Sequence, residues 1–369
     1  MRKLVGISVP FIVVLTLTVG CSQGPEEPAV TLDNPPITYS SNDLEENEGD
    51  EANEELNQDE DEDEESSENE ATPDTGTESQ NMRELYLIDA NGMVVPQTVT
   101  LPKTESLMKQ SLEYLVVDGP LQDVLPNGFR GVIPAGTTVD VNHLKEDKIA
   151  IANFSGEFND YNPDDEKQIF ESITWTLTQF EEVDEVKIQI NGIELEEMPM
   201  SETSIVGNLT RADGINLDSG DVIDMTNSQD VTLYFLSSHE NQAYYVPVTR
   251  RVENVESELA TAIEELTEGP NFPMSNLLTQ MTTEMELLEE PTLDDGKVVL
   301  NFNEAIQTIA GENAVIAQSI LDTIALTLTE QEGVEEVSIQ VNGEDTIYSE
   351  SGNVIETVVR PAIINAQPL

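Results

Sequence analysis

The sequence contains few cysteine, histidine and aromatic residues. Among 369 residues there are one cysteine, two histidines and one tryptophan. A single thiol excludes an internal disulfide, and one cysteine with two histidines falls short of the four ligands of a Cys/His zinc site. A Ser-His-Asp triad would have to use His143 or His239. The sequence therefore lacks the cysteine and histidine residues that most catalytic and metal-binding sites require.

Basic residues are equally scarce. Fifteen lysines and arginines face 74 acidic residues, which gives a formal net charge of -59. Binding to nucleic acid depends on clustered basic side chains that release counterions, and an anionic lipid surface repels a chain of this charge. We therefore expect no nucleic-acid partner and no direct binding to acidic headgroups.

The N-terminus carries the features of a secretory signal. Arg2 and Lys3 precede an apolar run from Leu4 to Val19, and this layout is typical of bacterial secretion. The alternative is an uncleaved transmembrane anchor, but a run of 16 residues (19 minus 3) is shorter than the roughly 20 residues that span a bilayer.

The segment Leu17-Thr18-Val19-Gly20-Cys21 resembles a lipobox, although Thr18 stands where leucine is usual. This resemblance predicts a signal peptide over residues 1–20 and a diacylglycerol on Cys21, which carries two fatty-acyl chains such as palmitate. Two or more acyl chains anchor a protein stably. We therefore expect a lipoprotein on the extracytoplasmic face of the cell membrane, with its only thiol consumed.

Residues 21–82 follow the signal as an acidic segment. No lysine or arginine occurs from Ser22 to Met82, and 17 acidic residues lie between Asp43 and Glu70. Such a composition buries too little apolar surface to offset its ordering entropy, so we predict a disordered tether. Blocks of like charge are usually solvated, which favours a spacer over a calcium sink or a docking tail.

The rest of the chain is an internal repeat. Val186-Lys187-Ile188-Gln189-Ile190-Asn191-Gly192 recurs as Val337-Ser338-Ile339-Gln340-Val341-Asn342-Gly343, at a spacing of 151 residues (337 minus 186). Other pairs return in the same order: Thr176-Leu177-Thr178 and Thr327-Leu328-Thr329, Asn153-Phe154 and Asn301-Phe302, Leu85-Tyr86 and Leu233-Tyr234, Val95-Pro96 and Val246-Pro247, Gly119-Pro120 and Gly269-Pro270. A repeat of this length indicates a duplicated domain.

Each copy shows two helical stripes and several short β-branched segments. The helices are predicted around residues 107–115 and 169–180 in the first copy and around 255–266 and 316–328 in the second. The strands are predicted at 85–89, 138–144, 148–154 and 186–190, then at 231–236, 297–302 and 337–341. We predict an α+β fold with helices on one face of a mixed β-sheet, in domains 83–198 and 231–345. A linker or lightly structured bridge over 199–230 and a C-terminal extension, 346–369, complete the organisation.

These motifs, together with Ile133-Pro134-Ala135-Gly136-Thr137 in the first copy, resemble the GerMN domain. The second copy has Met281 to Pro291 in place of that stretch, so its middle segment is expected to differ. The resemblance covers residues 83 to about 345. It implies two tandem GerMN domains with a fold similar to the ring-building motifs of secretion systems.

The resemblance also implies a role. Lipoproteins of this kind in spore-forming, Bacillus-type bacteria are non-enzymatic proteins of sporulation and germination. They lie between the mother-cell and forespore membranes and support an oligomeric channel complex, which suggests a ring-type homo-oligomer and protein partners. The alternative is an envelope lipoprotein that modulates a sensor or cell-wall protein in vegetative cells.

One segment has the spacing of a calcium loop. Asp160, Asn162, Asp164 and Glu171 stand at positions 1, 3, 5 and 12 of an EF-hand, but Asp165 occupies the position that needs glycine. The alternative is a helix start with Asn162 as N-cap and Pro163 as first residue. We favour the helix start, because an apolar stripe begins immediately afterwards.

No other residue is a strong candidate for chemistry. We interpret His143 and His239 as structural or surface residues, and Trp175 as core or domain contact. A cell-wall hydrolase would need carboxylates such as Glu157 or Asp164, which nothing singles out in so acidic a chain. We predict no catalytic, cofactor-binding or metal-binding residue and no cofactor, which leaves Cys21 as the one predicted site.

Overall fold

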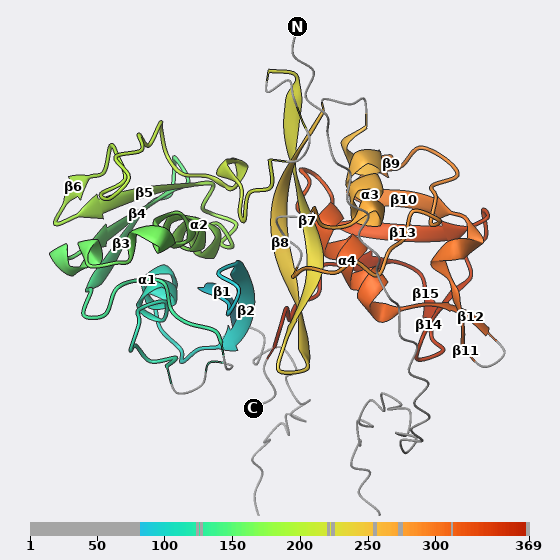
Figure 1. Cartoon of the computed structure of the whole chain (residues 1–369), viewed down its shortest axis with the longest axis horizontal. Coiled ribbons are helices and arrows are strands. Elements are labelled where there is room, and N and C mark those ends of the chain that lie inside the picture. The colour runs from blue at the N-terminus through green and yellow to red at the C-terminus, as the bar shows by residue number, and fades with distance from the viewer. Residues whose placement is uncertain are drawn as a thin grey trace, which may run out of the picture. The chain divides into compact units, whose positions relative to one another are not determined.

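The computed structural model describes residues 82–122, 125, 128–219, 222, 226–253, 257–271, 276–310 and 313–366. The predicted signal, Cys21 and the acidic tether lie outside the described residues. Two copies of an α+β unit make up the described chain, as predicted (Figure 1).

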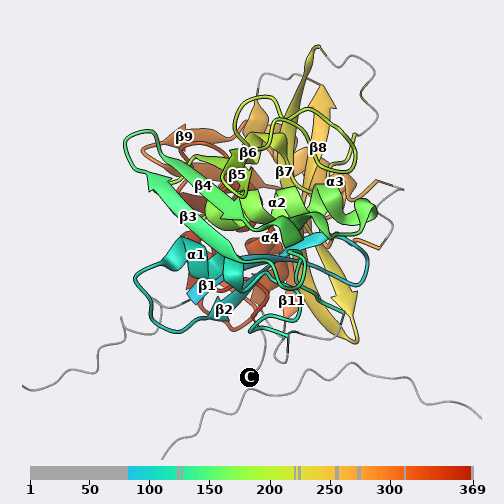
Figure 2. The same cartoon turned by 90° about the vertical axis from the view of Figure 1, so that its left-hand side faces the viewer.

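The first copy begins with a hairpin and continues into a sheet. The elements are β1 (Met82–Ile88), β2 (Val94–Thr100), α1 (Leu107–Glu113), β3 (Val139–Leu144), β4 (Ile149–Phe154), α2 (Glu166–Leu177), β5 (Glu185–Ile190) and β6 (Ile193–Glu194). The sheet order is β3-β4-β5-β6, and β3 and β4 face the viewer in Figure 2. Strands β4 and β5 are parallel, so α2 is the crossover helix between them.

The second copy repeats this plan with extra strands. Its elements are β7 (Ser228–His239), β8 (Gln242–Glu253), α3 (Glu258–Glu268), β9 (Thr292–Asp294), β10 (Lys297–Phe302), β11 (Thr308–Ala310), β12 (Asn313–Ile316), α4 (Gln318–Leu328), β13 (Glu336–Val341), β14 (Ile347–Ser349), β15 (Val354–Ile355) and β16 (Val358–Val359). The main sheet has the order β16-β13-β10-β9, with β10 and β13 parallel. A smaller sheet, β11-β12-β14-β15, is added beside it.

Each copy has its own apolar core between helices and sheet. In the first, Leu112, Ile169 and Ile173 of the helices pack with Val186 and Ile188 of β5. In the second, the helix residues Ile263, Ile320 and Ile324 pack with β10 and β13. Burial of such side chains stabilises a fold by about 1.5–3 kcal/mol each, which explains why the helical stripes are readable in the sequence.

The repeated Asn-Phe and Asn-Gly pairs act together. Asn191 and Gly192 both have positive φ, 51° and 79°, as a two-residue hairpin turn requires. The Asn153 carboxamide accepts a 2.8 Å hydrogen bond from the Gly192 amide. In the second copy, Asn301 accepts one of 2.9 Å from Gly343. In each copy, an asparagine at the end of one parallel strand therefore holds the Asn-Gly turn that follows the adjacent parallel strand.

The repeated Leu-Tyr and Thr-Leu-Thr motifs also meet in space. The Tyr86 amide donates to Thr176 Oγ1 at 3.1 Å, and the Tyr234 amide donates to Thr327 Oγ1 at 3.0 Å. In each case a helix hydroxyl satisfies a backbone group on the first strand of the hairpin. These bonds hold the hairpin against the crossover helix.

The start of α2 is the predicted helix cap. Asn162 accepts a hydrogen bond from the Asp164 amide, and Pro163 opens a short 3₁₀ turn that leads into the helix. Glu166 then accepts hydrogen bonds from the Tyr161 hydroxyl at 2.6 Å and the Met200 amide at 2.7 Å. The N-cap prediction is confirmed, and Glu166 connects the helix start to the chain that follows β6.

Two parts of the second copy differ from the expected repeat. Ile316 was predicted to begin a helix, but it ends β12, and α4 starts at Gln318. The edge strand is also shorter, because β9 spans three residues where β3 spans six. Met281 and Met285, from the segment that replaces the Ile-Pro-Ala-Gly-Thr stretch, are buried in the second core.

Candidate functional site at the junction of the two copies

The segments that follow the two sheets are themselves repeated. The first contains Arg211, Ile215 and Asn216, and the second contains Arg360, Ile364 and Asn365. Both have the pattern Arg-x-x-x-Ile-Asn, at a spacing of 149 residues (360 minus 211). We call residues 209–218 the first tail and residues 358–366 the second tail. Both tails lie at the junction between the copies, next to strands β2 and β8.

The first tail joins the hairpins of both copies. The buried Asn216 carboxamide accepts from the Val94 amide at 2.8 Å and donates to the carbonyls of Val94 and Pro247, at 2.7 and 2.8 Å. Ile215 exchanges two bonds with Thr249, at 3.0 and 2.8 Å. One asparagine therefore satisfies backbone groups on β2 of the first copy and β8 of the second.

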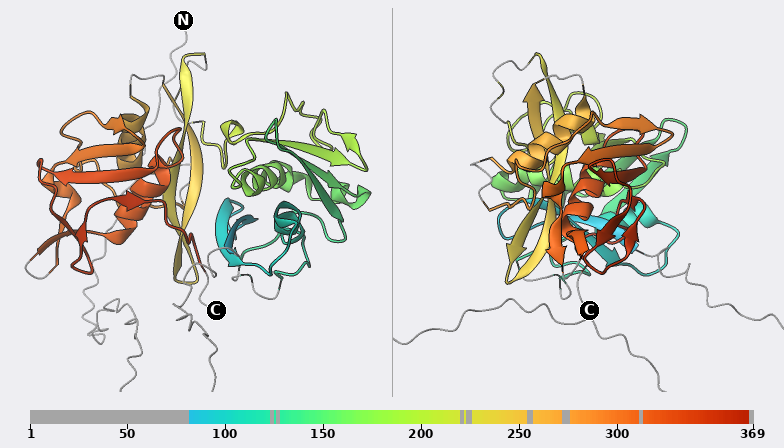
Figure 3. Two further views of the ribbon diagram at one scale, coloured as in Figure 1. Left: turned by 180° about the vertical axis from the view of Figure 1, so that it is seen from behind. Right: turned by 90° about the vertical axis from the view of Figure 1, so that its right-hand side faces the viewer.

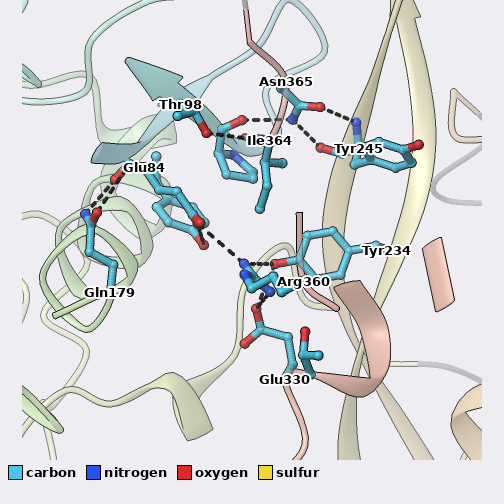
Figure 4. Close-up of polar contacts among 12 residues, drawn as sticks. Glu84, Thr98, Gln179, Tyr234, Tyr245, Glu330, Arg360, Ile364 and Asn365 are labelled. Atoms are coloured by element: carbon cyan, nitrogen blue, oxygen red, sulfur yellow. Dashed lines mark hydrogen bonds and ion pairs between the residues drawn. The ribbon is translucent and has the colours of Figure 1, made fainter. Parts of the chain in front are cut away.

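The second tail makes the same contacts in reverse. Asn365 accepts from the Tyr245 amide at 2.7 Å and donates to the carbonyls of Tyr245 and Pro96, both at 2.8 Å. Ile364 exchanges two bonds with Thr98, at 2.8 and 2.9 Å (Figure 4). Each tail thus crosses to the hairpin of the other copy, as in an isologous, two-fold interface.

Two matching apolar clusters flank the tails. The first holds Tyr86, Val94, Trp175 and Ile215, and the second holds Tyr234, Tyr245, Leu326 and Ile364. Every member of the first occupies the same position of the repeat as one member of the second. Strands β7 and β8 run between the copies (Figure 3), so these clusters are buried at the junction.

Partly buried arginines lie beside both clusters, around the buried carboxylate of Glu330. Glu330 accepts from Arg211 Nη1 at 2.6 Å, from Arg360 Nη1 at 2.8 Å and from the Tyr234 hydroxyl at 2.8 Å. Arg360 also reaches Glu84 of β1 at 3.4 Å (Figure 4). The Arg211 guanidinium lies 4.3 Å from the centre of the Trp175 ring. Charge pairs and cation–π contacts therefore link both tails to both copies.

The two arginines control the ionisation of Glu330. Its side chain is only 7% exposed, and burial alone would raise the pKa of this carboxyl. Arg211 and Arg360 outweigh burial and lower the pKa to about 2. Glu330 is therefore ionised at neutral pH, and the cluster holds two cations and one anion at its centre, with Glu84 at its side.

Further contacts join the copies without a counterpart in the repeat. The Tyr244 hydroxyl donates to Asp89 Oδ2 at 2.7 Å, and both side chains are buried. Phe129 packs edge-on against the Tyr244 ring at 5.2 Å, and Val95 of β2 is part of the second core. Burial of Tyr244 raises the pKa of its hydroxyl to about 12, so it remains a hydrogen-bond donor at physiological pH.

The residues considered for catalysis do not converge. His143 Nε2 lies 2.9 Å from the Glu182 carbonyl, and His239 ends β7. Asp164 is exposed in the helix cap. Glu157 lies on a separate 3₁₀ turn, where the Ser155 hydroxyl lowers the pKa of its carboxyl, which is the opposite of what a general acid requires. Trp175, which we expected to be a core residue or a domain contact, is buried in the first apolar cluster at the junction.

The described residues contain no group of three or more His, Cys, Asp or Glu side chains placed to hold a metal ion. Within the same part of the chain, no helix has the length and apolar character needed to cross a membrane.

The repeat units coincide with a known family. A family model described as "Germane: Sporulation and spore germination" matches residues 84–196 and 232–346. The chain belongs to the Germane family. The spore germination protein GerM of Bacillus subtilis (strain 168) is 49% identical over 287 residues, which cover 77% of this chain and 78% of that protein.

A solved tandem-domain structure agrees with this assignment. The tandem GerMN domains of the sporulation protein GerM from Bacillus subtilis superpose with a TM-score of 0.73 at 48% identity, over 78% of this chain and 99% of that one. The first GerMN domain of the same protein is 59% identical over 35% of this chain and 97% of its own, with a TM-score of 0.34. This Germane protein therefore has a role in sporulation or germination.

The junction of this Germane protein was not predicted from its sequence. The tails lie in segments that we expected to be a linker, 199–230, and an extension, 346–369. The repeated Arg-x-x-x-Ile-Asn pattern was a readable signal, because it recurs at nearly the offset of the other motifs. Its charged and amide residues resemble ordinary surface residues until the opposite hairpin is placed against them.

Proposed function

We propose that the chain is a non-enzymatic lipoprotein that stabilises an oligomeric channel complex between mother cell and forespore. A diacylglycerol on Cys21 anchors it to the extracytoplasmic face of the mother-cell membrane around the forespore. The acidic tether carries the two GerMN domains away from that membrane. Family membership and the role of the GerM relative support the setting in sporulation and germination.

The observation that carries the structural role is the closed junction. Both tails and both hairpins take part in one two-fold contact. In it, each copy places its Arg-x-x-x-Ile-Asn motif against the hairpin of the other copy. An isologous contact closes on itself and cannot add further subunits. The chain is therefore built as a preassembled pair, and a growing ring would have to use surfaces outside the junction.

Suitable surfaces remain at the edges of the two main sheets. Strand β3 is an edge of the first sheet, and β9 is an edge of the second. An edge strand offers unpaired backbone groups to a neighbouring chain. Because the two edges belong to different copies of one rigid pair, a contact from β3 of one chain to β9 of the next would be heterologous and would propagate.

The buried polar groups support a structural role over a catalytic one. The side chains of Asn216, Glu330 and Arg360 each make several hydrogen bonds, and each has one partner in the other copy, which is Pro247, Arg211 and Glu84 respectively. These contacts hold the two copies in one arrangement. A catalytic group needs a perturbed side chain that faces substrate, whereas these side chains face one another.

The test is purification of the lipid-anchored protein from sporulating cells after crosslinking of its neighbours. We expect recovery with several copies of itself and with channel proteins, and loss of this recovery when Cys21 is replaced by serine. Recovery from vegetative membranes only, with a sensor or cell-wall protein, would contradict the proposal and support the alternative envelope role.

A further inference from the structure

A cavity lies in the first copy, on the side of α2 that faces the first tail. Its volume is about 450 Å³, and apolar side chains form much of its wall: Phe170, Met198, Leu209 and Leu217. The cavity belongs to the first copy and its tail, so it is separate from the sheet edges discussed above. It is large enough for one extended side chain of a partner.

The wall contains four acidic residues, of which Asp164 is exposed in the helix cap, and the other three differ in their hydrogen-bond partners. Glu166 accepts bonds from a hydroxyl and from two backbone amides, and Asp213 accepts from the Thr210 amide at 2.7 Å. Glu171 differs, because its buried Oε1 atom accepts no hydrogen bond of ordinary geometry and is satisfied by an ion pair with Lys167. The Glu171 side chain is 91% buried (100 minus 9), and its ion-pair partner Lys167 lies 3.5 Å away and is half exposed.

In the second copy, the carboxylate at the position equivalent to Glu171 has a hydrogen-bond donor from the same chain. Asp322 of α4 occupies the position of Glu171, and the Tyr245 hydroxyl donates to it at 3.0 Å. In the first copy the position of Tyr245 is taken by Val94, which has no donor. Gln318, which stands where Lys167 stands, also donates to Asp322, at 2.8 Å. The duplicated carboxylate thus receives a tyrosine hydroxyl in the second copy, whereas in the first copy its partners are Lys167 and the backbone amide of Asn216.

We propose that the cavity binds the basic side chain of a partner protein, whose cation pairs with Glu171 and whose aliphatic stem packs on the apolar wall. Lysine and arginine combine such a stem with a terminal cation. A chain with 74 acidic and 15 basic residues attracts a basic partner electrostatically. The inference goes beyond the channel role, since it holds for whatever assembly the chain joins.

The state of Glu171 supports this occupant. Burial raises the pKa of its carboxyl, and Lys167 together with a hydrogen bond from the Asn216 backbone offsets that effect only in part. A buried carboxylate with little compensation gains from a second cation and from displaced water. Lys167 is half exposed, so its ammonium can turn into solvent when another cation enters.

The experiment uses methyl NMR spectra of the full-length chain in detergent, with n-butylammonium chloride as the lysine side-chain probe. The methyl groups of Met198, Leu209 and Leu217 report on the wall. We expect saturable shifts with n-butylammonium and with n-propylguanidinium. We expect binding about tenfold weaker with n-butanol, which has the same stem without the charge.

Two variants isolate the carboxylate and its competitor. Glu171→Gln should weaken n-butylammonium binding by about tenfold, whereas the matched control Glu146→Gln, an exposed carboxylate on the β3–β4 turn, should leave it unchanged. Lys167→Gln reproduces the second copy and should strengthen binding by about twofold, because an i,i+4 pair is lost. The proposal would be overturned if n-butanol bound as tightly as n-butylammonium. It would also be overturned if Glu171→Gln, or Lys167→Gln, left n-butylammonium binding unchanged.

A last comparison distinguishes a partner side chain from a free polyamine. An acetylated and amidated Gly-Lys-Gly peptide should bind at least as tightly as n-butylammonium, with the same dependence on Glu171. Spermidine binding that depends on Glu171 and is far tighter than binding of the peptide would assign the cavity to a free polyamine and overturn the protein-partner assignment.

Discussion

A single position of the repeat shows how the two copies came to differ. Gln179 and Glu330 are equivalent residues, 151 apart (330 minus 179). Gln179 uses its amide locally, on the backbone of Glu84. Glu330 instead accepts from Arg211 of the first tail, across the junction, and from Arg360 and the Tyr234 hydroxyl of its own copy. The amide of Gln179 therefore makes a contact within its own copy, whereas the carboxylate of Glu330, at the same position of the repeat, lies at the centre of the interface.

The first prediction concerns that carboxylate. Glu330→Gln restores the residue of the first copy but leaves Arg211 and Arg360 without their shared anion. Removing one partner from a buried ionic cluster costs about 3–5 kcal/mol, so we expect the free energy of unfolding to fall by about 3 kcal/mol. Urea denaturation measures the change. Glu332→Gln, an exposed neighbour, is the control, and equal stability of the two variants would refute the assignment.

The second prediction concerns pH. The pKa of Glu330 is about 2 in the folded protein against an ordinary 4.5, so its ionised form stabilises the folded state above pH 4.5. That contribution is lost as the pH falls from about 4.5 towards 2, and it amounts to about 3 kcal/mol at most. Urea denaturation at pH 5 and pH 3 should show the loss, and Glu330→Gln should reduce it. An unchanged pH dependence in that variant would be contrary evidence.

At the scale of elements, the two tails act as crossed straps. Each places one asparagine between β2 and β8, and these two strands carry Pro96 and Pro247 at the point of contact. Proline donates no backbone hydrogen bond, so it is suited to a sheet edge. Its carbonyl is then free to accept from the asparagine of the opposite tail. The proline of each repeated Val-Pro pair thus contributes to the junction through its backbone carbonyl.

The third prediction tests the straps. Asn216→Ala removes three hydrogen bonds and leaves buried backbone groups unsatisfied, which costs about 1–3 kcal/mol for each buried group. We expect a loss of about 3 kcal/mol in unfolding free energy, and a smaller loss for Asn365→Ala, because Asn365 is only half-buried. Chemical denaturation of both variants is the measurement. Asn142→Ala on the exposed edge strand is the control, and a loss as large as that of Asn216→Ala would argue against the straps.

Periodicity and turn signals predicted the helices and most core strands, because each is fixed by contacts inside one copy. The predicted strand at 297–302 coincides with β10, and the stripe at 169–180 gives α2. Strands β2 and β8 were missed, because a proline interrupts each. Each pairs along its length with β1 or β7 of its own copy, but part of the contact at its other edge comes from the tail of the opposite copy. The tails were missed for the same reason: a charged tail resembles solvent-exposed chain until the opposite copy is present.

At the scale of the whole molecule, the charge is divided between two parts. The tether contributes 22 negative charges, and residues 83–369 contribute 39 more, from 52 acidic and 13 basic residues. The 13 basic residues include Arg211 and Arg360, which are placed at the junction. A chain so short of cations has used two of them to join its domains.

The fourth prediction concerns the tether. Because blocks of like charge are usually solvated, and the junction contacts described above come from residues 84–365, deletion of residues 43–70 should leave the unfolding free energy of the tandem domains unchanged, within about 0.5 kcal/mol. Urea denaturation of the full-length and shortened chains provides the comparison. A cooperative loss of stability on deletion would show that the tether packs on the domains.

The central claim is that the two copies form one rigid pair through a closed, two-fold junction. The most direct measurement is the distance distribution between spin labels on Glu146→Cys in the first copy and Glu332→Cys in the second, in a chain with Cys21→Ser. The account predicts one narrow distribution that broadens when Asn216→Ala and Glu330→Gln are combined. A broad distribution in the parent chain would contradict it.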